Sequence, residues 1–192
     1  MTTAIRPLET PRLILRPLEL ADAERVQELF PHWDIVKYLG AIVPWPYPEG
    51  AALAYFRDQA LPAISRGDEW HWTLRLKSDP GRLIGCITLR KSARKNRGFW
   101  LGLPWHEQGL MSEAVEAVTT YWFDELGLPL LRVSKAAANL ASRRISEKQG
   151  MRVIGVEQAT YVCGPLSAEI WEITAEEWRQ RRKRRDANSG LN

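Results

Sequence analysis

Short runs in which apolar and polar residues alternate recur along the chain, each bounded by glycine, proline or other turn-forming residues. Such alternation is typical of strands that bury one face. It predicts strands at residues 12–17, 70–76, 83–89, 98–103, 130–134, 151–156 and 168–173. A Ser-Asp-Pro-Gly turn at residues 78–81 separates the second run from the third, so these two strands should form a hairpin. Gly102 inside the fourth run indicates a β-bulge or a close approach to the backbone.

Apolar residues three and four positions apart predict helices between these strands. Asn139 and Thr174 have the chemistry of N-terminal caps for the last two helices. The predicted helices cover residues 21–30, a stretch from near 48 to 67, 109–126, 139–150 and a terminal stretch from 174 onward. Residues 44–48 contain three prolines and should form a stiff aromatic loop. Helices that alternate with strands, together with a hairpin, predict an α/β fold with a mixed sheet covered by helices.

The composition agrees with a single globular domain. The chain has 192 residues, 45% hydrophobic and 26% charged. Cys86 and Cys163 lie far apart, so we expect neither a disulfide framework nor a metal site, as in a reducing compartment. The first seven residues lack the apolar run of a signal peptide, and no stretch is apolar enough to span a membrane. We therefore expect a cytoplasmic protein.

The positive charge of the chain lies at its C-terminal end. The net charge is +4, and residues 179–185 carry six positive charges, so subtracting six leaves −2 for the rest. We therefore predict a domain at residues 1–178 and a basic tail at 179–192. The tail is either a solvated helix end, favoured by the helix dipole, or a contact for RNA, a ribosome surface or an acidic partner. It contains no interleaved aromatic residues, so it could attract a nucleic acid by charge but has no side chains that recognise bases.

The clearest chemical signal is the predicted strand 98–103 with the turn and helix that follow it. A helix that begins at Gly109 presents amides without intrahelical partners and a partial positive charge. Glycine lets a ligand approach these amides, so an anion such as a pyrophosphate fits there. A glycine at a helix start is also common as a plain turn residue. The segment alone leaves both interpretations open.

Four segments together resemble the GNAT acetyltransferase superfamily, and more narrowly its RimJ/RimL-like branch, which acetylates ribosomal-protein N-termini. They lie at residues 10–17, 104–114, 139–151 and 173–178, in the order expected for the family. The resemblance implies the GNAT fold, an α/β (α+β) arrangement with a mixed, mostly antiparallel central sheet flanked by helices. It also implies that acetyl-CoA binds where this sheet splays open, between its fourth and fifth strands.

The resemblance further implies a set of cofactor-binding residues. The strand end would pair with the pantetheine amides, and the turn with the first helical residues would hold the pyrophosphate. The helix after residue 139 would reach the pantetheine arm, the thioester or a phosphate. These residues are Leu101, Gly102, Leu103, Gln108, Gly109, Leu110, Met111, Ser112, Asn139, Ser142 and Arg143. Arg143 is equally well explained as an exposed helix arginine.

The sequence departs from the family at four positions. His106 and Met111 occupy the first and last places of the Gln/Arg-x-x-Gly-x-Gly/Ala pattern, which leaves binding through backbone amides intact. The tyrosine that many members use to protonate the leaving thiolate falls at Ser146. The glutamate often found before the bulged strand falls near Asn96. Both usual proton-transfer groups are therefore missing from those positions.

Acyl transfer needs a neutral amine, a donor to the thioester carbonyl and a route for the thiolate to leave. We expect the N–H near Leu103 to be the oxyanion donor and Ser142 to supply the proton, directly or through water. A peptide α-amine is roughly a tenth neutral at pH 7, whereas lysine is neutral in well below about a thousandth of molecules. An enzyme without the usual glutamate therefore suits α-amines. The candidate bases are His71, Glu69 and Glu107, and the candidate substrate-facing residues are Trp45 and Tyr47.

Three functions are consistent with these residues. The first is acetyl transfer from acetyl-CoA to the N-terminal α-amine of a protein or peptide, such as a ribosomal protein. The second is acetylation of a small amine such as an aminoglycoside, a polyamine or an amino acid, which an acidic pocket would favour. The third is a non-catalytic module that binds acyl-CoA, or binds RNA through the basic tail. Whether the chain forms a homodimer is left open.

Overall fold

The computed structural model describes residues 5–189. Residues 1–4, part of the segment inspected for a signal peptide, and residues 190–192 of the predicted basic tail lie outside the described residues. Within the described range, no helix has both the length and the apolar character needed to cross a membrane.

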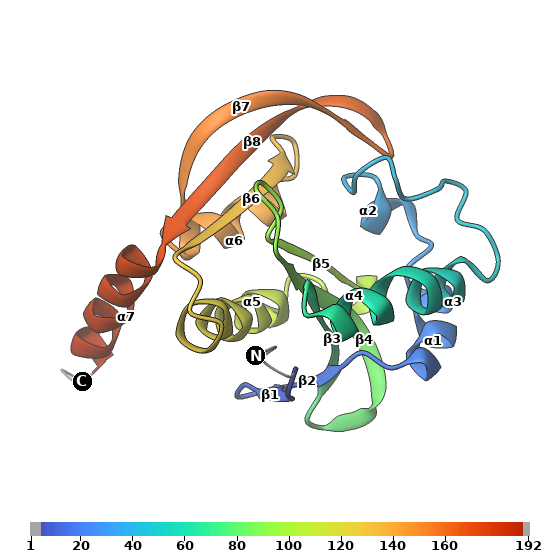
Figure 1. Cartoon of the computed structure of the whole chain (residues 1–192), viewed down its shortest axis with the longest axis horizontal. Coiled ribbons are helices and arrows are strands. Elements are labelled where there is room, and N and C mark those ends of the chain that lie inside the picture. Colours follow the sequence, from blue (N-terminus) through green and yellow to red (C-terminus); the bar gives the residue numbers. More distant parts are fainter. Residues whose placement is uncertain (1–4, 190–192) are drawn as a thin grey trace.

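Two sheets with antiparallel pairing form the frame of the fold (Figure 1). The first sheet has the order β1-β2-β3-β4-β5 and the second the order β6-β8-β7. The strands of the first sheet are β1 (Leu8–Glu9), β2 (Leu13–Pro17), β3 (Glu69–Leu76), β4 (Asp79–Arg90) and β5 (Arg97–Leu101). The strands of the second sheet are β6 (Leu130–Ala136), β7 (Arg152–Tyr161) and β8 (Gly164–Thr174). The predicted strands and the β3–β4 hairpin are confirmed, whereas the two-residue strand β1 was not predicted.

The two sheets meet at one point, between the predicted fourth and fifth strands. The backbone N–H of Asn96 donates to the carbonyl of Arg132 at 2.8 Å, and the Asn96 Oδ1 accepts from the Arg132 N–H at 2.7 Å. Beyond this joint, β5 pairs with β4 and β6 pairs with β8. The splayed, mostly antiparallel sheet that the resemblance implies is therefore confirmed. Asn96, near which the resemblance would place a glutamate, connects the two sheets.

The helices follow the predicted order. The helical elements that precede α5 along the chain are η1 (Leu20–Asp22), α1 (Ala23–Leu29), α2 (Trp33–Val36), α3 (Ala51–Tyr55), η2 (Phe56–Ala60), α4 (Leu61–Arg66) and η3 (Leu103–Trp105). The remaining helical elements are α5 (Leu110–Thr120), η4 (Tyr121–Glu125), α6 (Leu140–Lys148) and α7 (Ala175–Ser189). The predicted helix start near Pro48 is wrong by three residues. The side chain of Gln27 donates to the Pro48 carbonyl at 3.0 Å and accepts from the Ala52 N–H at 3.1 Å, which fixes the start at Ala51.

The first sheet is buried on both faces. On one face, Trp72, Leu74 and Val118 belong to a large apolar cluster that includes α5. The other face packs against α1, α3 and η2, as the second cluster with Val26, Ala52 and Phe56 shows. The side of β3 that carries His71, one of the candidate bases, is consequently interior. His71, Thr73 and Arg75 are all buried.

The described part of the predicted basic tail, residues 179–189, forms most of α7. Thr174 caps this helix as predicted, since its Oγ1 accepts from the Glu177 N–H at 3.2 Å. Trp178 is buried in the large cluster, and α7 continues past it to Ser189 without a break. Arg182 pairs with Asp124 at 2.6 Å. The division of the chain at residue 178 and the RNA contact of the tail stay predictions.

Candidate functional site

A cavity of about 650 Å³ lies at the split between the sheets. Its walls come from α2 and the residues just after it, the end of β5, the turn before α5, and the first turns of α5 and α6. The hairpin of β7 and β8 arches over to the α2 side (Figure 1), where the Val162 N–H donates to the Leu39 carbonyl at 3.0 Å. The predicted cofactor residues that line the cavity are Leu101, Gly109, Leu110, Met111, Ser112, Asn139 and Ser142.

The turn before α5 is stabilised by a glycine in the left-handed conformation and by Arg12, which lies just before β2. Gly109 has a φ of 76° and caps the helix, so the amides that follow it face the cavity side of the turn. The Arg12 side chain donates to the Gln108 carbonyl at 3.0 Å and to Glu113 at 2.8 Å. Burial would raise the pKa of Glu113, but hydrogen bonds from Thr10 and Arg12 outweigh it and lower that pKa. We did not predict a role for Arg12, although it lies in the first segment of the family resemblance.

The strand before this turn ends earlier than predicted. β5 pairs regularly with β4 from Gly85↔Leu101 to Leu89↔Arg97, and Leu103 already belongs to η3. The predicted bulge at the end of the strand is therefore wrong, while the predicted close approach at Gly102 is confirmed. A Cβ on Gly102 would lie 2.8 Å from the ring of Trp105. Gly102, Leu103 and Gln108 are not among the described residues that line the cavity.

Two further residues of the turn face the cavity. His106 Nε2 lies 2.8 Å from the carbonyl oxygen of Leu101. Since a carbonyl can only accept, that nitrogen carries the proton in this contact. Glu107 has a φ of 61°, a left-handed conformation that disfavours side chains other than glycine. Of the three predicted bases, only Glu107 lines the cavity in the described part of the chain.

The first turn of α6 forms the opposite wall. Asn139 caps it as predicted, with its Oδ1 accepting from the Ser142 N–H at 3.1 Å. The ammonium of Lys135, on β6, donates to the Ser142 carbonyl at 2.8 Å and contacts the hydroxyl of Ser146. Ser146, the residue at which the family resemblance would place a tyrosine, is fully buried. Burial, together with the positive charge of Arg97, lowers the pKa of Lys135 well below its usual value.

The arginine that the structure places on this wall is not the predicted one. The guanidinium of Arg143 lies 3.0 Å from Glu169 on β8, and Arg143 is absent from the described lining of the cavity. Arg144 and Lys148, both exposed and one helical turn apart, line it instead. A helix turns by about 100° per residue, so neighbouring residues face different sides, and the sequence alone does not decide between them.

The predicted substrate wall lies elsewhere in the structure. Tyr47 packs edge-on against Phe30, with ring centroids 5.1 Å apart, and burial raises the pKa of its hydroxyl. The ring centroids of Trp45 and Trp33 are 5.6 Å apart, and Trp45 is 41% exposed. Neither Trp45 nor Tyr47 is among the described lining residues. The wall on this side consists of Asp34, Ile35, Lys37, Tyr38 and Leu39.

His71 is a buried residue of the sheet. Its Nε2 lies 2.6 Å from Glu69 and its Nδ1 lies 3.1 Å from the Thr88 hydroxyl. Burial would raise the pKa of Glu69, but the hydrogen bond with His71 and the charge of Arg90 lower it. Both ring nitrogens of His71 thus have hydrogen-bond partners within the sheet. The described lining of the cavity includes neither His71 nor Glu69.

The cavity carries a slight excess of basic residues. Lys37, Arg144 and Lys148 line it together with two carboxylates, Asp34 and Glu107. Lys37 pairs with Asp34 at 2.6 Å, and this lowers the pKa of Asp34. Over residues 5–189, no cluster of three or more His, Cys, Asp or Glu side chains is arranged to hold a metal ion.

Comparisons with known proteins agree with this architecture. The family model described as an acetyltransferase (GNAT) domain matches residues 12–152. YoaA of Bacillus subtilis (strain 168), described as an uncharacterized N-acetyltransferase, is 32% identical over 172 residues, which cover 86% of this chain and 95% of YoaA.

Solved structures share the fold. RimL, a ribosomal L7/L12 α-N-protein acetyltransferase in complex with coenzyme A, has a TM-score of 0.75 at 14% identity, over 89% of this chain and 99% of RimL. MccE, a microcin C7 self-immunity acetyltransferase in complex with acetyl-CoA and AMP, has a TM-score of 0.70 at 15% identity, over 85% and 93%. The match of the family model, supported by the relative at 32% identity, shows that this chain belongs to the GNAT acetyltransferase family and is an acyltransferase enzyme.

Proposed function

We propose that this enzyme transfers the acetyl group of acetyl-CoA to the N-terminal α-amine of a protein or peptide. The observation that carries the proposal is the cavity of about 650 Å³ into which the start of α5 and the capped start of α6 both face. The amides from Gly109 to Ser112 hold the pyrophosphate, because a helix start offers unpaired donors and a partial positive charge. Asn139 and Ser142 contact the pantetheine arm.

The charge of the cavity supports an α-amine acceptor. Polyamines and aminoglycosides carry several positive charges and need an acidic pocket. Here Lys37, Arg144 and Lys148 outnumber the two carboxylates, and one of these, Asp34, is already paired. The N-terminal α-amine of a peptide carries a single positive charge. In about a tenth of the molecules this amine is already neutral at pH 7 without any base.

The acceptor nitrogen attacks the thioester carbon, the C–S bond breaks, and the nitrogen loses one proton as the amide forms. We assign the removal of this proton to Glu107, the predicted base that lines the cavity. Ser142 protonates the leaving thiolate, directly or through water. The N–H near Leu103 plays no part in this proposal, because Leu103 belongs to η3 and not to a bulged strand.

The acceptor can be identified by mass spectrometry of the acetylated product. A thiol reagent is unsuitable, because the exposed Cys163 would react with it. The enzyme is incubated with acetyl-CoA and three acceptor sets, namely lysine-free peptides with a free N-terminus, the same peptides N-blocked and carrying one lysine, and small polyamines and aminoglycosides. We expect turnover on the first set. Turnover only on the third set would mean that the acceptor is a small molecule. Binding of acetyl-CoA without turnover on any set would mean that the protein is a non-catalytic binding module.

Glu107→Gln tests the proposed base. We expect kcat/KM at pH 7 to fall by about 10²-fold, with KM for acetyl-CoA little changed. Because this proton leaves the nitrogen after the attack, the defect should remain at pH 9, where most of an α-amine is already neutral. A defect that disappears at pH 9 would mean that Glu107 only deprotonates the ammonium before the attack.

A further inference from the structure

One side of α7 carries basic residues that are paired with acidic residues of the domain. Arg181 and Arg185 both pair with Glu116 on α5, at 2.9 and 2.5 Å. Arg182 pairs with Asp124 on η4 at 2.6 Å. Residues three and four positions apart share one side of a helix, so these ion pairs lie where α7 faces the domain. The fold accounts for these three charges.

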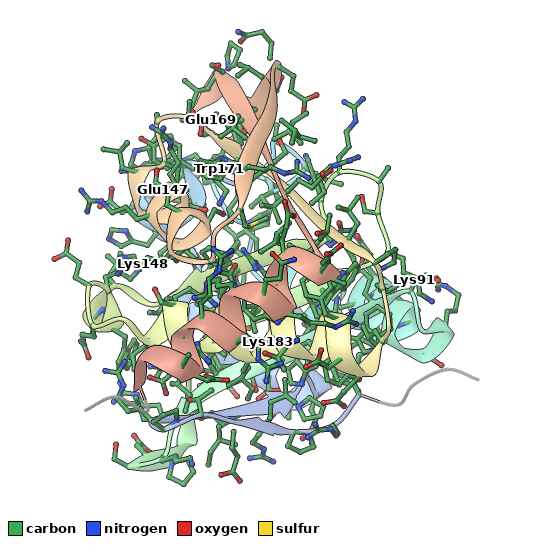
Figure 2. All side chains as sticks on the ribbon, turned by 90° about the vertical axis from the view of Figure 1, so that its left-hand side faces the viewer. Lys91, Glu147, Lys148, Glu169, Trp171 and Lys183 are labelled. Atoms are coloured by element: carbon green, nitrogen blue, oxygen red, sulfur yellow. The ribbon has the colours of Figure 1, made fainter. Side chains whose placement is uncertain are left out.

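The outward side of α7, formed by Arg179, Lys183 and Arg184, is different. All three residues are exposed, and none of them makes a hydrogen bond or an ion pair within the described range. Glu176 and Asp186, the exposed acidic residues of this helix, contact other side chains. Figure 2 shows α7 lying across this side of the molecule, with Lys183 labelled on it. The outward side is thus a surface of unpaired positive charge.

The stability of the helix does not explain these charges. A helix dipole favours cations in the last turn, but the last turn of α7 contains no basic residue. Arg179 and Lys183 lie four positions apart, where two like charges repel each other and slightly destabilise a helix. A negatively charged partner would remove this repulsion. The outward side therefore has the properties of a binding surface for an anion that lies outside the described chain.

The side chains of the outward side indicate the chemistry of this partner. Among the residues of α7 whose side chains are described, Ala187 is the only exposed apolar one. The helix therefore has no apolar side chain to insert into a membrane or into a hydrophobic groove. Two of the three free cations are arginines, and a guanidinium binds a phosphate group through two parallel hydrogen bonds. No aromatic residue of the described part of α7 is exposed, so bases would not be stacked.

We propose that the outward side of α7 binds the phosphate backbone of RNA independently of base sequence. A nucleic acid strand carries a dense row of charges and releases condensed counterions when cations bind, which favours it over an acidic protein. The choice of RNA rests on the proposed function, since ribosomal proteins are among the proposed acceptors and are bound to RNA. None of the three basic residues lines the main cavity of the described chain, so acetyl transfer to a free peptide does not need this contact.

The dependence of RNA affinity on salt tests the proposal. Fluorescence anisotropy with a labelled single-stranded RNA of about 12 nucleotides measures the affinity of the full chain. Contacts to about three phosphates predict that Kd rises with roughly the second power of the salt concentration, or about 20-fold between about 50 and about 200 mM. A second RNA of the same length and a different sequence should bind equally well.

The triple variant Arg179→Gln, Lys183→Gln, Arg184→Gln removes the three charges and keeps residues that favour a helix. We expect it to bind the RNA roughly 10- to 100-fold more weakly at about 50 mM salt, with little remaining dependence on salt. Thermal unfolding should show that the variant is folded. Its turnover on free peptides should equal that of the wild type.

The matched control is a triple variant with the same change in net charge at exposed positions outside α7, namely Arg16→Gln, Lys91→Gln, Lys95→Gln. It should keep the RNA affinity of the wild type to within about twofold. Comparison of the two triple variants separates a contact with α7 from a general effect of net charge.

Three results would overturn the inference. The wild type does not bind the RNA at about 50 mM salt, or the two triple variants bind it equally well. The third is that a polyglutamate peptide of the same charge binds as tightly as the RNA, which would assign the surface to an acidic protein. None of these results changes turnover on free peptides, so the proposed function would stand. Loss of turnover on every acceptor with intact RNA binding would reject the proposed function alone.

Discussion

Gly109 and Glu107, two residues apart in the turn before α5, both adopt left-handed backbone conformations, with φ values of 76° and 61°. For an ordinary L-residue this conformation costs about 1–2 kcal/mol. The surrounding contacts hold the turn in place, since the side chain of Gln108 donates to the Pro104 carbonyl at 2.9 Å and Arg12 donates to the Gln108 carbonyl. Strain held in this way at a ligand site is a common means of presenting backbone amides.

Gly109→Ala tests the turn. A Cβ here would meet Arg12 only at 3.5 Å, so the cost lies in the backbone conformation and not in a clash. We expect about 1 kcal/mol less stability and a weaker affinity for acetyl-CoA, measured by thermal unfolding and calorimetry. Gly127→Ala is the matched control, because Gly127 also has a positive φ, of 64°, has open space around it and does not line the described cavity. It should lose similar stability and keep the affinity; equal affinities in both variants would contradict the role of the turn.

Lys135 makes stability depend on pH. Its pKa is lowered in the folded protein and stands near 10.5 when exposed, so the unfolded chain binds the extra proton between these two values. Unfolding free energy therefore rises with pH across that window, by up to about 1.4 kcal/mol per pH unit. We expect the wild type to gain stability relative to Lys135→Met between pH 7 and pH 10 in urea unfolding. Parallel stability curves would mean that Lys135 stays charged in the fold.

At the scale of the elements, the split between β5 and β6 depends on one side chain. Asn96 is buried, and its Oδ1 accepts from the Arg132 N–H while its Nδ2 donates to the carbonyls of Arg90 and Ser92. Three segments are thus joined at the point from which the two sheets diverge. Asn96, near which the family resemblance would place a glutamate, thus has a structural role here.

Asn96→Ala removes all three hydrogen bonds of this side chain and leaves buried backbone groups unpaired. We expect the free energy of unfolding to fall by about 2–3 kcal/mol in a denaturant titration. Lys95→Ala, at the exposed neighbouring position, should change it by less than about 0.5 kcal/mol. A small effect of Asn96→Ala would show that water replaces the lost partners and that the joint is not essential.

At the scale of the whole molecule, α7 connects regions far apart in the sequence. Trp178 is fully buried, with its ring 6.1 Å from that of Phe123, and Arg181 reaches Glu116 on α5 and the Lys148 carbonyl on α6. The basic segment predicted as a tail is thus in contact with α5 and α6, two of the helices that line the main cavity. Its charges are partly matched by acidic residues, which the sequence pattern alone does not reveal.

Deletion of residues 179–192 tests whether this contact stabilises the fold. We expect the free energy of unfolding to fall by about 1–2 kcal/mol, with a smaller difference in about 1 M salt, where ion pairs are screened. Deletion of residues 187–192 leaves the ion pairs of Arg181, Arg182 and Arg185 in place and should change little. If the longer deletion leaves stability unchanged as well, the segment is an independent tail.

The sequence by itself determined the features that depend on neighbours along the chain. The β3–β4 hairpin, the helix start at Gly109 and the cap at Asn139 each follow from a few adjacent residues, because turns and caps are local structures. The family resemblance supplied the splayed sheet, and the described cavity lies at its split.

Only the tertiary structure decided which side chains share the site. The burial of His71 and the partial burial of Tyr47 depend on helices that cover the other face of the sheet. Which arginine of α6 lines the cavity, Arg144 or its neighbour, depends on how α6 is rotated. The contact of α7 with α5 and α6 depends on packing between segments far apart in sequence. These features arise from non-local contacts, which periodicity and spacing along a single chain do not encode.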